Sequence, residues 1–348
     1  MIISDLEFYL VEIPCEAVAP VRTVLVRLAT DTGQEGWGEA QLEWRSGELE
    51  ARRDALLPIL MGRKVFDIEE LITLDALRPA ALRSAVEIAS WDLVGQITRQ
   101  PLCHLFGGGY RQRIPMAVRL EAASPHQTAH FAREMAEQGF HWQIVSSSGH
   151  LETDLETIAA VREHTGERTE LNLDAAANYD METARELCTE LEDQNVQFVL
   201  DPLAGGELDQ VASLRRQTTV PLAVRRSIRQ PADILAMLRH HAAQAALVDL
   251  ELVGGLVSAR KCGTIIQAGQ LLAAIGGGRS LGISVAAMLH LASATPAFSI
   301  CNESAYHQLQ DDVLVDSLEI ADGMIAVPQG PGLGIEVDRE KVEKYQVS

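Results

Sequence analysis

A regular repeat of apolar, β-rich segments constrains the fold of this chain more than any other feature of its sequence. From about residue 114 onward, such segments begin near Ile114, His141, Glu170, Val196, Pro221, Ala245, Gln270 and Ala297. The intervals between these starts are 27, 29, 26, 25, 24, 25 and 27 residues. Each interval accommodates one strand, one helix and two loops, so the pattern predicts a series of βα units.

The stretches between the predicted strands have helical patterns. Residues 180–191 (DMETARELCTEL) place apolar side chains at helical spacing, and residues 231–242 (PADILAMLRHHA) begin with a proline suited to a first helical turn. The strands at 196–200 (VQFVL) and 245–248 (AALV) are continuous apolar runs, as expected of buried parallel strands. The even spacing favours a closed (β/α) barrel over a doubly wound sheet.

The sequence before residue 114 has a different pattern. Residues 23–40 read as an antiparallel hairpin with a turn at DTGQ, and residues 80–96 (AALRSAVEIASWDLVGQ) read as an amphipathic helix. We therefore expect an α+β domain over 1–113 and a barrel over 114–322. The segment 323–348 is too short for a domain, and we expect it to return to the first one.

Composition narrows the possible partners and the compartment. The formal charge of −20 at pH 7 repels nucleic acid and anionic membranes. No apolar run reaches the roughly 18 residues that a membrane span needs, and the N-terminus has no signal pattern. The five cysteines are scattered and form no CxxC pair, which predicts free thiols in a cytoplasmic protein rather than a disulfide or zinc framework. They are Cys15, Cys103, Cys188, Cys262 and Cys301.

Three motifs in order carry a resemblance to a known family: residues 84–109 (SAVEIASWDLVGQITRQPLCHLFGGG), Gly254-Gly255 after a strand, and residues 328–334 (PQGPGLG). Together they resemble the mandelate racemase/muconate lactonizing branch of the enolase superfamily. The resemblance implies an α/β fold, a (β/α)7β TIM-like barrel with an N-terminal α+β capping domain. It also implies a homo-oligomeric isomerase or lyase (a racemase, cycloisomerase or acid-sugar dehydratase). Such enzymes remove a proton alpha to a carboxylate with the help of Mg²⁺.

In a (β/α) barrel the active site lies at the C-terminal ends of the strands. Those predicted ends mix isolated acids with arginines and lack a tight carboxylate cluster. In strand order they are Arg119, Ser146 to Gly149, Asp174, Asp201, the pair Arg225 and Arg226, Asp249 with Glu251, Gly276 to Gly278, and Asn302 with Glu303.

The resemblance implies three acids, on strands three, four and five, as Mg²⁺ ligands. Asp174 retains the first. The second position falls on Leu200, and Asp201 is one residue off, which turns its side chain to the other face of a strand. The third falls on the pair at 225–226 (RR). A divalent ion about 4 Å from one arginine would suffer roughly 8 kcal/mol at an effective dielectric near 20. We therefore expect neither a complete Mg²⁺ site nor another cofactor.

The acid–base groups of the resembled family are also incomplete. The two lysines at the end of strand two are missing from 142–149 (WQIVSSSG). Asp249 matches the aspartate that racemase-like members carry on strand six, but its histidine partner is missing from 274–281 (AIGGGRSL). Glu303 lies near a glutamate that protonates the substrate carboxylate in those members. Asp249 and Glu303 thus remain candidate catalytic residues, and a structural role for Asp249 stays open.

The cationic residues allow two interpretations. Asp174 forms an ion pair with Arg225 or Arg226, which puts a guanidinium where the metal charge would be. Alternatively, Arg225, Arg226 and Arg279 bind a small anionic molecule, a carboxylate or a phosphate, in bidentate fashion. The glycines at 276–278 form either a tight turn or an anion cradle.

Three hypotheses for function follow. The first is a diverged family member that has lost the Mg-dependent chemistry. The second is a non-catalytic protein that binds an anionic metabolite through Arg225 and Arg226. The third is an enzyme that uses Asp249 or Glu303 in metal-free acid–base work. A subunit that assembles with an active relative also remains possible.

Overall fold

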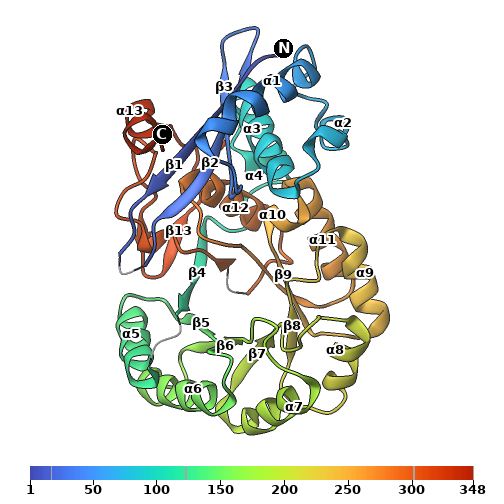
Figure 1. The fold of residues 1–348 in the computed structure, drawn as a ribbon, viewed down its shortest axis with the longest axis vertical. Helices are drawn as coiled ribbons and strands as arrows, with labels where there is room; N and C mark the ends of the chain where they lie inside the picture. The colour runs from blue at the N-terminus through green and yellow to red at the C-terminus, as the bar shows by residue number, and fades with distance from the viewer. Residues whose placement is uncertain (17, 122–123, 301, 348) are drawn as a thin grey trace.

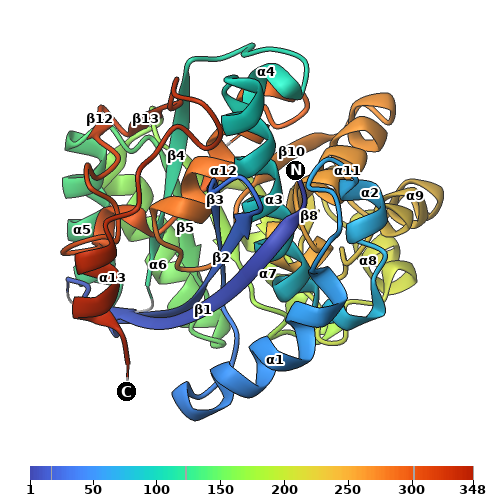
Figure 2. The same cartoon turned by 90° about the horizontal axis from the view of Figure 1, so that it is seen from above.

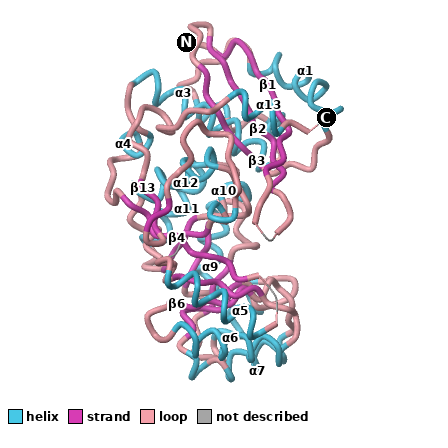
Figure 3. The backbone as a smooth tube through the Cα atoms, turned by 90° about the vertical axis from the view of Figure 1, so that its left-hand side faces the viewer, coloured by secondary structure: helices cyan, strands magenta, loops and turns pink. Residues whose placement is uncertain are grey.

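The computed structural model describes residues 1–16, 18–121, 124–300 and 302–347. An antiparallel sheet with its helices caps one end of a barrel of parallel strands, as Figure 1 shows with the cap at the top. The side view in Figure 3 shows the same two layers. This architecture confirms the predicted α/β fold, a TIM-like barrel with a capping domain.

The cap is built on strands β1 (Ile3–Ile13), β2 (Val21–Thr30) and β3 (Glu35–Ala40), in that order and antiparallel. Helix α3 (Ala80–Thr98) packs on this sheet. Gly38 of β3 makes that packing possible, because a Cβ there would lie 1.9 Å from the carbonyl oxygen of Ala85. The other cap elements are η1 (Ser46–Glu48), α1 (Leu49–Leu60), α2 (Ile68–Leu71), η2 (Asp75–Leu77) and α4 (Leu102–Leu105).

The barrel strands run parallel, and the ring closes where β11 pairs with β4 and Gly276 bridges to Glu303. The strands are β4 (Arg113–Leu120), β5 (Trp142–Ser146), β6 (Glu170–Asp174), β7 (Val196–Leu200), β8 (Leu222–Val224), β9 (Ala245–Val248), β10 (Leu272–Ile275) and β11 (Asn302–Glu303). The helices between them are α5 (Pro125–Glu137), α6 (Leu151–Thr165), α7 (Met181–Glu190), η3 (Glu192–Gln194), α8 (Leu208–Arg215), α9 (Pro231–His240), α10 (Leu250–Val253), α11 (Leu256–Ala268) and α12 (Gly282–Ala294).

The predicted strand starts are correct to within two residues for the first seven strands. The last start was wrong, because β11 begins at Asn302 and not at Ala297. Ala297, Phe298 and Ile300 are buried in the loop that precedes the strand. Their apolar character therefore reflects burial rather than strand pairing.

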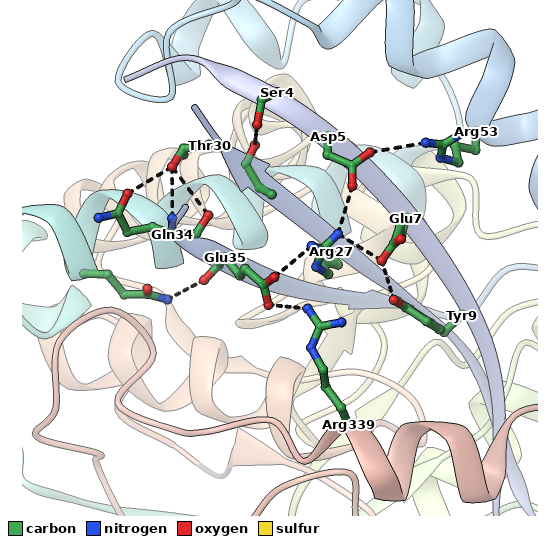
Figure 4. A network of polar contacts seen from close by, with 12 residues as sticks. Ser4, Asp5, Glu7, Tyr9, Arg27, Thr30, Gln34, Glu35, Arg53 and Arg339 are labelled. Atoms are coloured by element: carbon green, nitrogen blue, oxygen red, sulfur yellow. Dashed lines mark hydrogen bonds and ion pairs between the residues drawn. The ribbon is translucent and has the colours of Figure 1, made fainter. Parts of the chain in front are cut away.

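The chain after the barrel returns to the cap. It passes through η4 (Tyr306–Gln308) and the hairpin of β12 (Ile320–Ala321) and β13 (Met324–Ala326), and β13 pairs with β4. Helix α13 (Arg339–Tyr345) then packs on β1, as Figure 2 shows from above. Its Arg339 pairs with Glu35 in the network around Arg27 on the cap sheet (Figure 4).

Three buried acids of the cap bond to other parts of the chain, and we name Glu39, Glu87 and Asp92 the seam acids. Glu39 and Glu87 reach the barrel, and Asp92 reaches the C-terminal segment. Glu39 accepts hydrogen bonds from the amides of Leu281 (2.7 Å) and Ser284 (3.0 Å) at the start of α12. Helix N-termini leave such amides without intrahelical partners, so a carboxylate stabilises them.

The other two seam acids act similarly. Glu87 accepts from the Val257 amide at the start of α11 (2.7 Å), and Asp92 accepts from the Leu333 amide (2.9 Å). Burial raises the pKa of Glu39 to about 7, of Glu87 to about 8 and of Asp92 to about 6. The cap is therefore held to the barrel and to the C-terminal segment by carboxyl groups that face amides.

Within the described residues, no helix has the length and apolar character needed to cross a membrane. The thiols of Cys15, Cys103, Cys188 and Cys262 are free. Cys301 lies outside the described residues.

Candidate active site

Four charged side chains meet at the C-terminal ends of the barrel strands, and we name Arg119, Asp174, Arg225 and Glu303 the mouth quartet. Arg119 Nη1 lies 2.9 Å from Asp174 Oδ2, and its Nε lies 2.7 Å from Glu303 Oε1. Arg225 Nη2 lies 3.4 Å from Asp174 Oδ2, and its Nη1 lies 3.0 Å from Glu303 Oε2. Each arginine thus bridges both carboxylates.

The barrel geometry brings the quartet together. Arg119 lies near the end of β4, Asp174 ends β6, Arg225 follows β8, and Glu303 ends β11. Parallel strands of a closed barrel direct their C-terminal ends toward one mouth. The four side chains are only 10–20% exposed, so their charges interact with little screening by water.

The quartet sets the protonation of its own members. Burial alone would raise the pKa of Glu303, but the charges of Arg119 and Arg225 outweigh it and hold this pKa below its ordinary value. Burial lowers the pKa of Arg119, yet the two carboxylates raise it above the usual range. These shifts favour the charged forms of Glu303 and Arg119, and the quartet carries formal charges of two arginines and two carboxylates that cancel.

The two adjacent arginines have different environments. Arg225 points into the mouth with 14% of its side chain exposed, whereas Arg226 is 57% exposed and lies 3.8 Å from Asp201. The Asp201 carboxylate accepts the amides of both arginines, at 2.9 and 3.2 Å. Of the two pairings predicted for Asp174, the structure shows the one with Arg225.

Asp249 lies beside a cavity of about 30 Å³, which Glu251, Gln41 and Glu303 also line. This volume suffices for a water molecule or two. Asp249 Oδ1 accepts the amides of Glu251 (2.9 Å) and Leu252 (3.1 Å), so the residue caps α10. Burial raises the pKa of Asp249, and it raises that of Glu251 to about 8.

The glycines after β10 give these acids room. A Cβ on Gly276 would lie 2.4 Å from the carbonyl oxygen of Glu303, and one on Gly277 would lie 2.5 Å from Asp249 Oδ2. The φ of Gly276 is 153°, a value that side chains disfavour. This geometry supports the tight turn.

Arg279 bonds to the cap. Its Nη2 donates to the carbonyl of Ala19, and Gln41 Nε2 donates to the carbonyl of Arg279. The structure thus places this guanidinium against a cap loop and not in the quartet.

Two family models match this sequence. Residues 127–342 match the enolase C-terminal domain-like family, and residues 8–107 match the mandelate racemase/muconate lactonizing enzyme N-terminal domain. The chain belongs to the mandelate racemase/muconate lactonizing family of the enolase superfamily. This family of isomerases and lyases is the one that the three sequence motifs predicted.

Relatives match nearly the whole chain. Muconate cycloisomerase 1 of Rhodococcus opacus is 26% identical over 339 residues, which cover 92% of this chain and 90% of that protein. An L-Lys-D/L-Arg epimerase of Methylococcus capsulatus is 29% identical over 330 residues, 92% of each. The crystal structure of a dipeptide epimerase from Cytophaga hutchinsonii superposes with a TM-score of 0.93 at 23% identity, over 99% of each chain, which supports the fold.

The residues of this chain do not fit the Mg²⁺ site that the family implies. Leu200, where the resemblance implies the second ligand, is fully buried and packs in the apolar core cluster with Phe198. Asp201 has a φ of 46° and turns its carboxylate to the loop amides. The pair Arg225 and Arg226 falls where the resemblance implies the third ligand. Within the described residues, no three Asp, Glu, His or Cys side chains come together as a metal-binding group.

The resemblance implies two lysines at the end of β5. In this chain, neutral residues there surround one acid and hydrogen-bond to it. Asp154 is buried and accepts from the hydroxyls of Ser147, Ser148 and Tyr179. Ser146 Oγ accepts from Arg119 Nη1 at 3.3 Å. These contacts leave the serines as hydrogen-bonding and not proton-abstracting groups.

Sequence reasoning placed Arg119 at a strand end but did not pair it with Asp174. The one available signal was for its other partner, Glu303, because a closed barrel sets the last strand beside β4. It also gave Asp154 no role, because that acid lies in α6 and not at a strand end.

Proposed function

We propose that this chain is a diverged member of its family in which the mouth quartet replaces the metal, and that the Mg-dependent removal of an alpha proton has been lost. One observation carries the proposal. Arg225, one of the two arginines at the third ligand position that the resemblance implies, pairs with Asp174, which stands at the first such position.

Charge balance is the physical reason. An enediolate intermediate needs excess positive charge nearby, which a divalent metal supplies. Arg119 and Arg225 have their charges cancelled by Asp174 and Glu303, so the mouth offers a substrate carboxylate no comparable excess. The missing lysines remove the usual bases as well.

The cavity beside Asp249 favours a second candidate function, metal-free acid–base catalysis. Asp249 has a raised pKa and Glu303 a lowered one, and both line this cavity. Two acids whose environments move their pKa values apart suit one proton donor and one acceptor. In this alternative Asp249 transfers the proton, and Glu303 with its arginines orients an acyl or carboxyl group.

The two arginines of the anion-binding hypothesis differ in their availability to a ligand. Arg225 forms ion pairs with the carboxylates of Asp174 and Glu303, whereas Arg226 faces solvent outside the mouth. An anion held by both residues together would require the quartet to open.

A calorimetric titration tests the proposal. We expect no saturable heat when chelator-treated protein is titrated with Mg²⁺ or Mn²⁺. The double variant Leu200→Glu/Arg225→Asp rebuilds three acids with Asp174 and should gain one metal site. The matched control Leu200→Gln/Arg225→Asn changes shape similarly without the charges and should gain none. One-site binding by the unaltered protein would contradict the proposal.

Turnover distinguishes the second candidate function. The protein should be assayed against a panel of carboxylate substrates with and without chelator. Activity that resists chelator and is lost in Asp249→Asn would support acid–base work by Asp249. Activity that chelator abolishes would contradict both the loss of the Mg-dependent reaction and metal-free catalysis by Asp249.

A further inference from the structure

A second hollow lies outside the mouth quartet, where β7 and β8 end. Its volume is about 310 Å³, a size that suits a small metabolite or part of one. Its polar lining consists of Asp201, Gly205, Gly206, Arg226, Ser227 and Arg229. We name it the arginine hollow.

The local backbone explains why two guanidiniums face this hollow. β8 ends at Val224, and Arg225 and Arg226 lie in the turn that follows it, where the Ile228 amide donates to the Arg225 carbonyl at 3.0 Å. Asp201 fixes this arrangement by accepting both amides. Arg229 is anchored one turn later, because its Nε donates to the Arg226 carbonyl at 3.0 Å.

The charges of the arginine hollow leave a positive excess. Asp201 is its one acidic lining residue, and its two oxygens already accept backbone amides. Arg226 lies 3.8 Å from it, and within the described residues Arg229 makes no ion pair. One negative and two positive charges therefore line the hollow of a protein whose formal charge is −20.

Two glycines of the lining leave their backbone amides uncovered by side chains. Gly205 and Gly206 have φ values of 84° and 62°, and a Cβ on either would meet nothing within 4 Å. Glycine amides in such a conformation can approach an anion closely. The Ser227 hydroxyl adds a further donor on the side of the arginines.

We propose that the arginine hollow binds the phosphoryl group of a small metabolite. Guanidinium groups match phosphate oxygens in bidentate geometry, and two of them suit a dianion better than a monocarboxylate. This site goes beyond the proposed function and does not depend on it, since Arg226 and Arg229 lie outside the mouth quartet.

Inorganic phosphate is the probe for the test. Its binding should be followed by calorimetry and by ³¹P line broadening at constant ionic strength, with acetate as the monoanionic comparison. We expect saturable phosphate binding that weakens at least about tenfold in Arg226→Gln/Arg229→Gln. The control Arg216→Gln/Arg239→Gln removes two exposed arginines elsewhere and should bind phosphate like the unaltered protein.

Three outcomes would overturn this proposal: no saturable phosphate binding, an equal loss in the control variant, or acetate binding as tight as phosphate. The metal titration described above is independent of all three. Failure of the arginine hollow and failure of the quartet proposal are therefore distinguishable.

Discussion

The carboxylates of the mouth quartet and those of the seam acids are both buried, but the protein stabilises the two groups in different ways. In the mouth, Glu303 faces two guanidiniums, and its pKa is held low. In the seam, Glu39 and Glu87 face backbone amides, and burial raises their pKa values to about 7 and about 8.

The comparison shows what each region requires. Helix N-termini stabilise the carboxyl groups of Glu39 and Glu87 without a full counter-charge, so burial can raise the pKa of both toward neutral pH. The mouth places Asp174 and Glu303 within reach of the same two arginines, and the charges of these arginines hold the pKa of Glu303 below its ordinary value. In the mouth, the guanidiniums of Arg119 and Arg225 thus balance the charges of the two carboxylates.

The largest effect should come from opening the quartet. Arg119→Met removes one partner from both carboxylates and should lower the free energy of unfolding by about 3–5 kcal/mol, as measured by urea denaturation. Arg119→Met/Glu303→Leu removes one charge of each sign and should recover much of that loss. A loss below about 1 kcal/mol in the single variant would show that the quartet is not a buried ion-pair network.

The seam acids should give stability a negative dependence on pH. Their folded pKa values lie above the unfolded ones, so the folded protein holds protons that the unfolded chain releases. The free energy of unfolding should therefore fall by a few kcal/mol between pH 5 and pH 8. Glu87→Gln should flatten part of this fall in a series of urea melts. An unchanged slope in that variant would contradict the assignment of Glu87.

The quartet should give the opposite dependence at acid pH. The pKa of Glu303 is lowered in the fold, so its stabilisation is present above the ordinary glutamate value and is lost as pH falls through its folded pKa. Acidification below the ordinary glutamate pKa should therefore destabilise the unaltered protein more than Glu303→Gln, as measured by urea denaturation over a pH series. Equal acid sensitivity of the two proteins would contradict the claim that the ionised Glu303 carboxylate stabilises the fold.

The smallest effect should come from the exposed arginine. Arg226→Ala removes a side chain that is 57% exposed and 3.8 Å from its partner. Its free energy of unfolding should change by less than about 0.5 kcal/mol. Thermal melts at low and high salt check this, and a salt-sensitive loss of several degrees would show that Arg226 belongs to a structural network.

The sequence determined much of this picture because strand ends are readable from it. The repeat placed Asp174, Arg225 and Asp249 at the ends of their strands, and the one-residue shift at Leu200 and Asp201 indicated a lost ligand. The pairing of Arg119 with Glu303 was available from ring closure, which sets the last strand beside β4, but it was missed. The second pairing, with Asp174, depends on how far the arginine side chain reaches across the mouth, which the repeat does not fix. The start of β11 was missed because buried loop residues have the same apolar composition as a strand.

The most direct test of the central claim is a crystal structure of the protein grown with Mn²⁺, using anomalous scattering to locate the metal. The account predicts no anomalous peak beside Asp174 and the Arg225 guanidinium within hydrogen-bonding distance of Asp174 and Glu303. A peak coordinated by Asp174, with Arg225 swung out of the mouth, would contradict it.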